Sequence, residues 1–383
     1  MIRKIFVSAL ILCLSITHAQ EIEYKTSEKG INIGHIDTLY SRILNEKREL
    51  LIYLPESIKY SDYKRDKYPV LYLLDGRYNF LQMVALERQY AEKNDSKILP
   101  EMIIVGISNE NHNKRQLDYS PTKSGSPDNS GRGDQFLEFI KDELFTYIES
   151  HYPAASQNRS IIGHSFGGVA VLNALSRHSD MFENYLLIDA SLWYENELFL
   201  KDPEFNLINK NLAHKNLFIG IANTSQYGST IETIYKDTIS INKYVRHSLQ
   251  LKDQLYKSET GPNLKWEYYE NDTHGSSVFP AQLDALRFFY SWFEFKEERK
   301  YQGKYGLPES EEETFARLTE KHFEMVSKEL GYEFYPTIPW LINSSDMLLN
   351  YQKLPNQAKE LLLLSKKYYP ENKQIEDKLQ LLN

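Results

Sequence analysis

The stretch "RSIIGHSFGGVAVLNAL", residues 159–175, places one serine among small residues at the junction of two apolar segments. Residues 160–162 are typical of a short buried strand, and residues 169–175 of a helix. A strand that turns directly into a helix forces Ser165 into a sparsely populated backbone conformation, and small neighbours relieve the crowding. In this context G-x-S-x-G indicates a nucleophile elbow, whereas the pattern alone could be a glycine-rich turn without chemistry.

The rest of the mature chain alternates apolar runs of strand length with amphipathic segments. Apolar runs typical of strands occupy residues 48–56, 68–76, 101–108, 185–191, 216–223 and 265–271. Helical spacing occupies residues 134–152, 240–258 and 280–295. Strands that alternate with helices predict an α/β fold with a mainly parallel sheet covered on both faces. We assign this predicted domain to residues 20–296.

The C-terminal region, residues 297–383, has no strand pattern and is predicted to be all-α. Its helical segments are residues 310–331, 338–353 and 356–372. The last two, with Pro355 at the turn and Pro370 after the second helix, are similar to one tetratricopeptide unit. A single unit cannot bury its own apolar face. We therefore expect this helical tail to pack on the main domain rather than on a partner.

The N-terminus, "MIRKIFVSALILCLSITHAQ", predicts a signal peptide. Arg3 and Lys4 precede an apolar run, and Thr17-His18-Ala19 fits a cleavage site after Ala19. The apolar run is too short to span a membrane, and no later segment could do so. The mature protein is expected to be secreted or periplasmic. Because Cys13 is the only cysteine, the mature chain would contain no disulfide and no thiolate nucleophile.

The net charge of the chain indicates which classes of binding partner are expected. The chain carries 53 acidic and 45 basic residues, a formal net charge of −8. An acidic surface argues against nucleic-acid binding. The sequence contains neither a metal-ligand cluster nor a dinucleotide-binding G-x-G-x-x-G motif, so no metal and no cofactor are expected.

His274 is the predicted general base. It lies in "ENDTHGSS", after the strand at residues 265–271 and before the helix at 280. α/β-Hydrolases order their catalytic residues as serine, acid and histidine, which requires a late histidine. A serine hydroxyl is a weak nucleophile until an imidazole accepts its proton. His164, beside Ser165, is expected to be structural and to point elsewhere.

The acid of the triad has three candidates. It is expected after the strand at residues 216–222, where Asp237 is preferred because it precedes a helix start; Glu232 is the second choice. Asp189, after the preceding strand, is the third. Each could equally be an ordinary helix-end carboxylate, and a dyad without an acid is a further possibility.

The oxyanion site needs two backbone donors. One is predicted to be the N–H of Phe166, which follows the nucleophile. The other is expected from "LLDGRY", at Gly76 or Arg77, after the strand at residues 69–74. Asp75 is expected to brace that loop.

Several motifs together resemble the putative-esterase (esterase D-like) family of α/β hydrolases, and most closely its branch near the enterobactin-type siderophore esterases. The matching segments are "RELLIYLPE", "YPVLYLLDG", "IIVGISN", "RQLDYSPT", "GHSFGGVAVLNAL", "DASLWYENE" and "NDTHGSS", between about residues 40 and 295. The resemblance implies an α/β-hydrolase fold and hydrolysis of a small carboxylic ester through Ser165 and His274. It also implies that Arg115, Asp118 and Trp193 lie near the acyl or alcohol site.

Two of these residues have a second interpretation from the sequence itself. Arg115 could form a surface ion pair with Asp118, and Trp193 could belong to the core. Two other functions stay open as well. The same triad could transfer an acyl group to an alcohol, or the chain could be a non-catalytic scaffold that binds through its helical tail.

Overall fold

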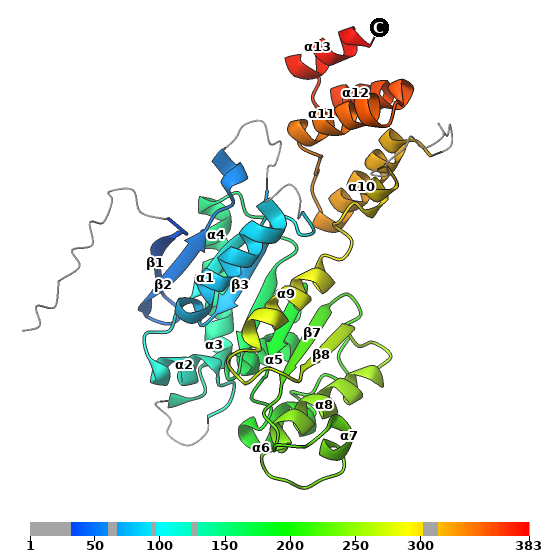
Figure 1. Cartoon of the computed structure of the whole chain (residues 1–383). Helices are drawn as coiled ribbons and strands as arrows, with labels where there is room; N and C mark the ends of the chain where they lie inside the picture. Colours follow the sequence, from blue (N-terminus) through cyan, green and yellow to red (C-terminus); the bar gives the residue numbers. More distant parts are fainter. Residues whose placement is uncertain (1–31, 60–66, 93–96, 124–128, 302–312, 383) are drawn as a thin grey trace, which may run out of the picture. The chain divides into compact units, whose positions relative to one another are not determined.

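The computed structural model describes residues 32–59, 67–92, 97–123, 129–301 and 313–382. One compact unit, Ile33–Asn383, contains both the α/β region and the helical tail. Figure 1 labels helices and strands of both. The division into residues 20–296 and 297–383 therefore stays a prediction. The predicted signal peptide, residues 1–19, lies outside the described residues.

An 8-stranded sheet forms the centre of the described α/β region, in the order β1-β2-β4-β3-β5-β6-β7-β8. The strands are β1 (His35–Ser41), β2 (Glu46–Tyr53), β3 (Val70–Leu74), β4 (Ile103–Ile107), β5 (Ser160–His164), β6 (Asn184–Ile188), β7 (Asn216–Ala222) and β8 (Asn263–Tyr269). β1 and β2 are antiparallel to their neighbours. The strands from β4 to β8 in this order run parallel. The predicted α/β fold with a mainly parallel sheet is confirmed.

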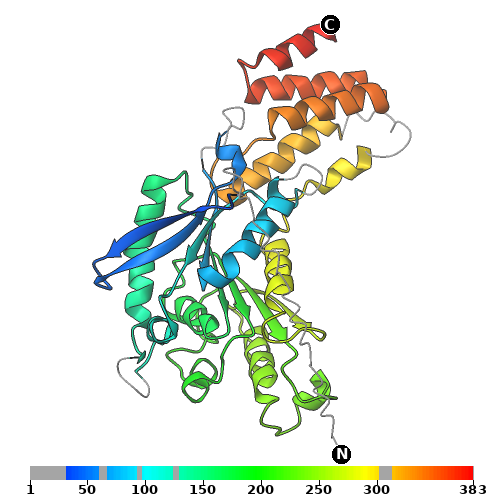
Figure 2. The ribbon, with the colours of Figure 1, turned by 60° about the vertical axis from the view of Figure 1, so that its left-hand side comes forward.

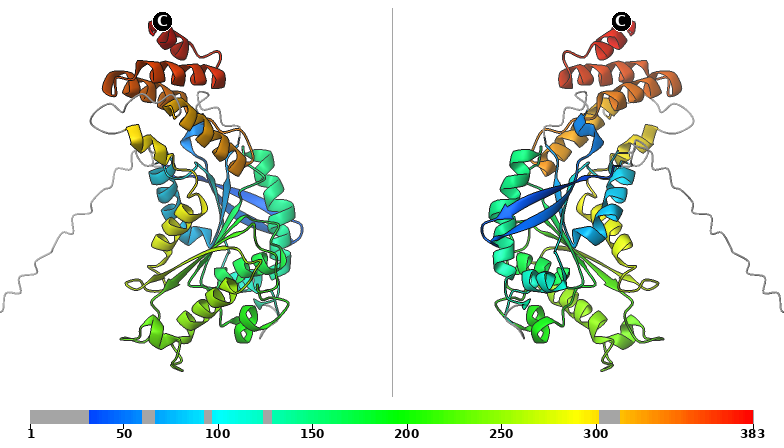
Figure 3. Two further views of the ribbon diagram at one scale, coloured as in Figure 1. Left: turned by 90° about the vertical axis from the view of Figure 1, so that its right-hand side faces the viewer. Right: turned by 90° about the vertical axis from the view of Figure 1, so that its left-hand side faces the viewer.

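Helices cover both faces of the sheet (Figure 3). The central strands β3 and β4 are apolar and buried at every position, and alternate side chains point to opposite faces. In β3, Leu71 and Leu73 pack with α1 (Gly76–Glu87) and α9 (Val278–Phe289). Tyr72 and Leu74 enter the other core. That second core also contains apolar residues of α3 (Gly133–Glu138), α4 (Phe145–His151), α5 (Gly167–Arg177) and α8 (Lys243–Tyr256).

The predicted helix at residues 134–152 is interrupted. A π-helical turn at Phe139–Leu144 joins α3 to α4. Four α-helices of the described α/β region have no counterpart in the sequence analysis. These are α1, α2 (His112–Tyr119), α6 (Tyr194–Lys201) and α7 (Ile231–Ile234).

The helical tail consists of helices packed side by side (Figure 2), and it has a hydrophobic core of its own. It contains α10 (Phe315–Leu330), α11 (Ile338–Asp346), a π-helical turn at Met347–Tyr351, α12 (Pro355–Tyr368) and α13 (Lys373–Leu381). The α11–α12 hairpin was expected, whereas α13 was not. A small cluster joins the tail to the end of the α/β region, because Trp292 and Phe293 pack against Val326, Leu330 and Phe334.

Within the described ranges, no helix has both the length and the apolar character needed to cross a membrane.

Candidate active site

The predicted elbow is present at the end of β5. Ser165 has φ 56°, in the left-handed region, and α5 begins two residues later. The glycines are required by close contacts. A Cβ on Gly163 would lie 2.3 Å from the carbonyl oxygen of Gly167, and one on Gly168 would lie 2.5 Å from the Cβ of Ala190. The turn therefore presents one serine at the carboxyl edge of the sheet, in a conformation that its neighbours impose.

His274 lies between β8 and α9 and is paired with Asp189. Its Nδ1 is 2.5 Å from Oδ2 of Asp189. The side chain of His274 is 47% exposed, whereas that of Asp189 is 6% exposed. Asp189 follows β6 directly, and its other carboxylate oxygen accepts a hydrogen bond from the N–H of Ala222 at 3.3 Å. A buried, oriented carboxylate thus holds one nitrogen of an accessible imidazole.

Asp237, the preferred acid of the sequence analysis, does not reach His274. Its carboxylate accepts hydrogen bonds from the Asn242 side chain at 2.6 Å and from the N–H of Ile239 at 3.1 Å, and it forms an ion pair with Arg246. It therefore braces the segment between α7 and α8. Glu232 lies in the exposed first turn of α7. The third candidate, Asp189, is the one that contacts the histidine.

Asp75 and Gly76 form the loop after β3. Asp75 has φ 55° and its side chain makes no capping bond to α1, which begins at Gly76. Both carboxylate oxygens instead accept from Arg115, at 2.7 Å from Nε and 2.7 Å from Nη2. A Cβ on Gly76 would lie 2.7 Å from the backbone of Gly106, so only glycine fits. The first N–H groups of α1 consequently have no side-chain cap from Asp75.

Arg115 and Arg77 have separate environments. Arg115 also donates from Nη2 to the carbonyl of His164 at 3.2 Å, and it does not pair with Asp118. Asp118 is fully buried against two other arginines, Arg48 and Arg132. The Arg77 side chain is 63% exposed and pairs with Glu49 of β2 at 2.9 Å. Only the backbone of Arg77 therefore stays a candidate for the oxyanion site.

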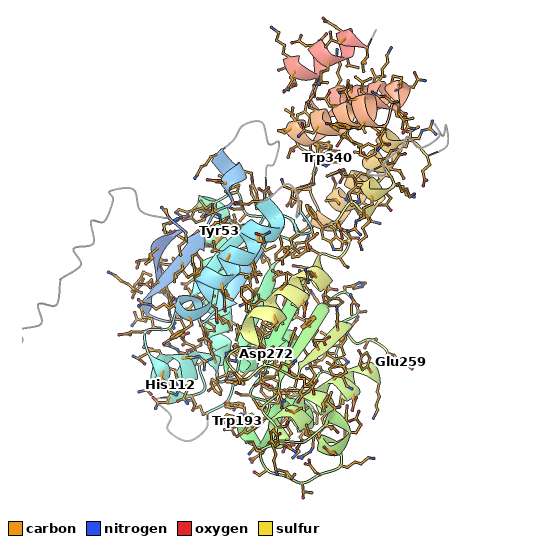
Figure 4. The ribbon with its side chains drawn as sticks, in the orientation of Figure 1. Tyr53, His112, Trp193, Glu259, Asp272 and Trp340 are labelled. Atoms are coloured by element: carbon orange, nitrogen blue, oxygen red, sulfur yellow. The ribbon has the colours of Figure 1, made fainter. Side chains whose placement is uncertain are left out.

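Trp193 is a surface residue, 45% exposed, in the segment after β6 (Figure 4). Two residues before it, the N–H of Ser191 donates to the carbonyl of Ser165 at 3.0 Å. The next residue, Tyr194, packs edge-on against Phe166 with ring centroids 5.5 Å apart. The interpretation of Trp193 as a core residue is therefore wrong, and its ring is accessible on a segment bonded to the elbow.

His164 does not point away from the site, contrary to expectation. Its Nε2 lies 2.8 Å from the carbonyl oxygen of His274, and the two rings have centroids 4.4 Å apart. Burial, with the nearby His274, lowers the pKa of His164 to about 4. The residue before the serine is thus part of the site.

A polar hollow of about 380 Å³ lies beside the Asp75–Gly76 loop. It is lined by residues of β2, of the start of α1, of the segment after β4 and of α2, including Arg77, Asn109 and Lys114. Among the described residues, no group of three histidine, cysteine or acidic side chains could hold a metal ion.

A family model described as "Putative esterase" matches residues 41–271. Ferri-bacillibactin esterase BesA of Bacillus subtilis is 28% identical over 239 residues, which cover 58% of this chain and 78% of that protein. Siderophore triacetylfusarinine C esterase of Aspergillus fumigatus is 27% identical over 157 residues, 39% of this chain. That match spans 53%, about half, of the length of the fungal protein.

Among solved structures, an IroE-like serine hydrolase from Shewanella oneidensis is similar with a TM-score of 0.67 and 26% sequence identity. The match covers 88% of this chain and 99% of that one. A coverage of 88% cannot be reached without part of the helical tail. The similarity therefore extends beyond the sheet and its covering helices.

Proposed function

Because this chain belongs to the family described as "Putative esterase" and is a hydrolase that acts on esters, we propose that it cleaves carboxylic esters through an acyl-enzyme on Ser165. One observation carries this proposal: Asp189 holds Nδ1 of His274. A carboxylate in that position fixes the tautomer of the imidazole and leaves Nε2 to accept the serine proton. The three residues occur in the order serine, acid, histidine, as in other α/β-hydrolases.

Acylation begins when the Ser165 hydroxyl gives its proton to Nε2 of His274 and its oxygen attacks the ester carbonyl carbon. Asp189 stabilises the imidazolium that forms. The tetrahedral intermediate then expels the alcohol, which takes the proton from His274. In the second half, a water molecule gives a proton to His274 and attacks the acyl carbon, and the released serine oxygen recovers that proton.

The oxyanion is proposed to bind the N–H of Phe166 and an N–H at the start of α1, from Gly76 or Arg77. Helix N-termini carry unpaired donors and a partial positive charge. Phe166 precedes α5 directly, and α1 begins at Gly76. Since Arg115 binds both oxygens of Asp75, that carboxylate does not occupy the start of α1. Donors arranged in advance stabilise the charge that develops in the transition state.

Trp193 is proposed to contact the substrate, because its exposed ring lies on the segment bonded to the elbow. Arg115 is proposed to brace the oxyanion loop rather than to bind substrate. Two of the similar proteins are named for siderophore esters, so siderophore-type esters are the first class to assay. We also propose that residues 1–19 direct export and that the α11–α12 hairpin is tetratricopeptide-like. A purified mature protein would then begin at Gln20, which intact mass measures.

The test of the proposed reaction compares Ser165→Ala with Ser150→Ala, a control on the exposed end of α4. Purified variants are assayed with p-nitrophenyl, feruloyl, acetyl-sugar and catecholate-siderophore esters. Ser165→Ala should lower kcat by about 10³-fold or more and abolish labelling by a fluorophosphonate. Ser150→Ala should match the parent protein. A folded Ser165→Ala protein with unchanged turnover would refute the proposal. Products formed with added alcohols distinguish hydrolysis from acyl transfer.

A further inference from the structure

His164 connects three segments of the candidate site. Its carbonyl oxygen accepts a hydrogen bond from Arg115, which in turn holds Asp75 beside the start of α1. Its ring nitrogen Nε2 lies 2.8 Å from the carbonyl oxygen of His274. Its own peptide bond leads directly to Ser165. The residue is therefore attached to the nucleophile, to the proposed oxyanion loop and to the proposed base.

The direction of the ring hydrogen bond determines which nitrogen of the neutral His164 ring carries the proton. A carbonyl oxygen can only accept, so the proton of the neutral imidazole must be on Nε2. The carbonyl of His274 also accepts from the hydroxyl of Ser277, but at 3.3 Å and from the same local segment. The contact from His164 is shorter and comes from β5. Thus Asp189 holds the side chain of His274, while His164 holds its backbone.

We propose that His164 is a positioning residue whose Nε2–H bond to the His274 carbonyl sets the distance between Ser165 and His274. This inference rests on the proposed function, because it assigns a role relative to the proposed nucleophile and base. A fixed separation matters because proton transfer needs hydrogen-bond geometry. A misplacement of about 1 Å can cost about 10²-fold in rate.

Burial and the adjacent His274 favour a neutral ring at His164, whereas the carboxylates of Asp189 and Asp75 favour a charged one. His274 faces it from the segment after β8, Asp189 lies at the end of β6, and Asp75 with Arg115 lies at the His164 backbone carbonyl. Burial is the largest cause that lowers the pKa of His164, to about 4, and the adjacent His274 adds to it. A neutral ring donates to the carbonyl without placing a second positive charge beside the imidazolium of the reaction.

The test uses the full mature chain and two substitutions. His164→Gln keeps an N–H donor at a similar reach, whereas His164→Leu keeps much of the volume and removes the donor. We expect His164→Leu to lower kcat on p-nitrophenyl acetate by about 10- to 100-fold, with KM changed less than about threefold. The rate of fluorophosphonate labelling should fall in parallel. His164→Gln should recover most of both rates. Equal losses in the two variants, or no loss in His164→Leu, would overturn the inference.

Ser165→Ala in the same assay separates this inference from the proposed function. An active Ser165→Ala protein would refute the proposed function, whereas an inactive one beside a fully active His164→Leu protein would refute only the role of His164. Should His164→Leu fail to fold, ¹⁵N NMR of the parent protein gives an independent measurement. We expect the His164 ring to be neutral, with the proton on Nε2, from about pH 5 to 8. A neutral ring with its proton on Nδ1 would overturn the inference, because Nε2 could then not donate to the His274 carbonyl.

Discussion

Oδ2 of Asp189 lies 2.5 Å from Nδ1 of His274, a contact that joins the end of β6 to the segment after β8. The carboxylate is almost completely buried, and the imidazole is half exposed. Charge-assisted hydrogen bonds of this kind are stronger than neutral ones. The pairing therefore orients the His274 ring through Nδ1, while the ring stays half exposed.

Replacing Asp189 with Asn should reduce activity strongly. Asn preserves the shape but cannot stabilise the imidazolium, and it can favour the wrong tautomer of His274. We expect kcat to fall by about 10²- to 10⁴-fold, as for a triad aspartate, while KM changes little. Steady-state kinetics on p-nitrophenyl acetate measures both quantities.

Asp237→Asn is the matched control. Asp237 bonds to Asn242 and Arg246 and not to His274. Its substitution should leave kcat within about twofold of the parent value, the scatter expected away from the reacting groups. The assignment of Asp189 would be wrong if Asp237→Asn lost more activity than Asp189→Asn.

Arg115 and Asp75 should act as one unit. Breaking the pair leaves a buried partner without its counter-charge and frees the Asp75 carboxylate to approach the start of α1. We expect Arg115→Ala to lower kcat by about 10- to 100-fold, a loss smaller than or comparable to that of one oxyanion donor. Arg115→Lys should recover little, because lysine cannot form the two-pronged contact.

A double-mutant cycle tests this coupling. Asp75→Asn combined with Arg115→Ala should cost much less than the two single losses added together. Arg287→Ala, on α9 with a half-exposed side chain, controls for the loss of a positive charge. Strict additivity in the cycle would argue that Arg115 acts on the substrate directly.

The elbow and the histidine were predictable because their signals are local. Ser165 lies between an apolar strand and a helix with glycines where backbones touch, and His274 follows a strand late in the chain. The acid was not predictable in this way. Which strand-end carboxylate reaches the histidine depends on how β6 and β7 are aligned, which brings Asp189 beside Ala222. The sequence contains the aspartate in "LLIDAS" but not that alignment.

The role of α2 was also hidden in the sequence. Its segment, "HNKRQLDY", is polar and lacks the apolar stripe that predicts a helix. Its two important side chains find partners far away in sequence, Arg115 at Asp75 and Asp118 at Arg48 and Arg132. The same limit applies to His164, whose partner is 110 residues away. Long-range polar pairs of this kind leave no periodic signal.

Glu87 should make the stability of the protein depend on pH. The hydroxyl of Tyr53 lies 2.8 Å from Glu87 and 2.5 Å from Glu92, yet it carries only one proton. Burial, with the charge of Glu92, raises the pKa of Glu87 to about 8. The folded protein thus holds a proton that the unfolded chain, with an ordinary glutamate pKa of about 4.3, releases. The free energy of unfolding should therefore fall as pH rises from about 4.5 to 8.

Glu87→Gln removes this ionisation and keeps a donor and an acceptor in place. Urea unfolding at pH 5, 7 and 9 should show Glu87→Gln gaining stability relative to the parent protein as pH rises. Glu110→Gln, an exposed control, should show no such trend. A constant difference between Glu87→Gln and the parent protein at all three pH values would mean that Glu87 is ionised throughout.

The contact between the helical tail and the α/β region should stabilise the chain without supplying catalytic groups. Phe334 is 3% exposed, and its ring packs edge-on against Phe293 with centroids 5.6 Å apart. The Asn158 side chain adds a hydrogen bond to the carbonyl of Glu329 at 2.7 Å. Phe334→Ala should lower the free energy of unfolding by about 3–5 kcal/mol, as for other buried phenylalanines. Leu363→Ala, at a position 54% exposed, should change it by less than about 0.5 kcal/mol.

Measurements of kcat in these variants distinguish a stabilising role of the helical tail from a catalytic one. At a temperature where Phe334→Ala is folded, its kcat on p-nitrophenyl acetate should lie within about threefold of the parent value, because Ser165, His274 and Asp189 all precede the tail. Truncation after Lys296 exposes Trp292 and Phe293 and should reduce solubility or Tm more than kcat. A truncated protein that stays soluble and equally stable but loses more than about 100-fold in kcat, roughly 2.7 kcal/mol, would place the tail in the active site. Loss of turnover on a bulky siderophore ester alone would instead assign the tail to substrate binding.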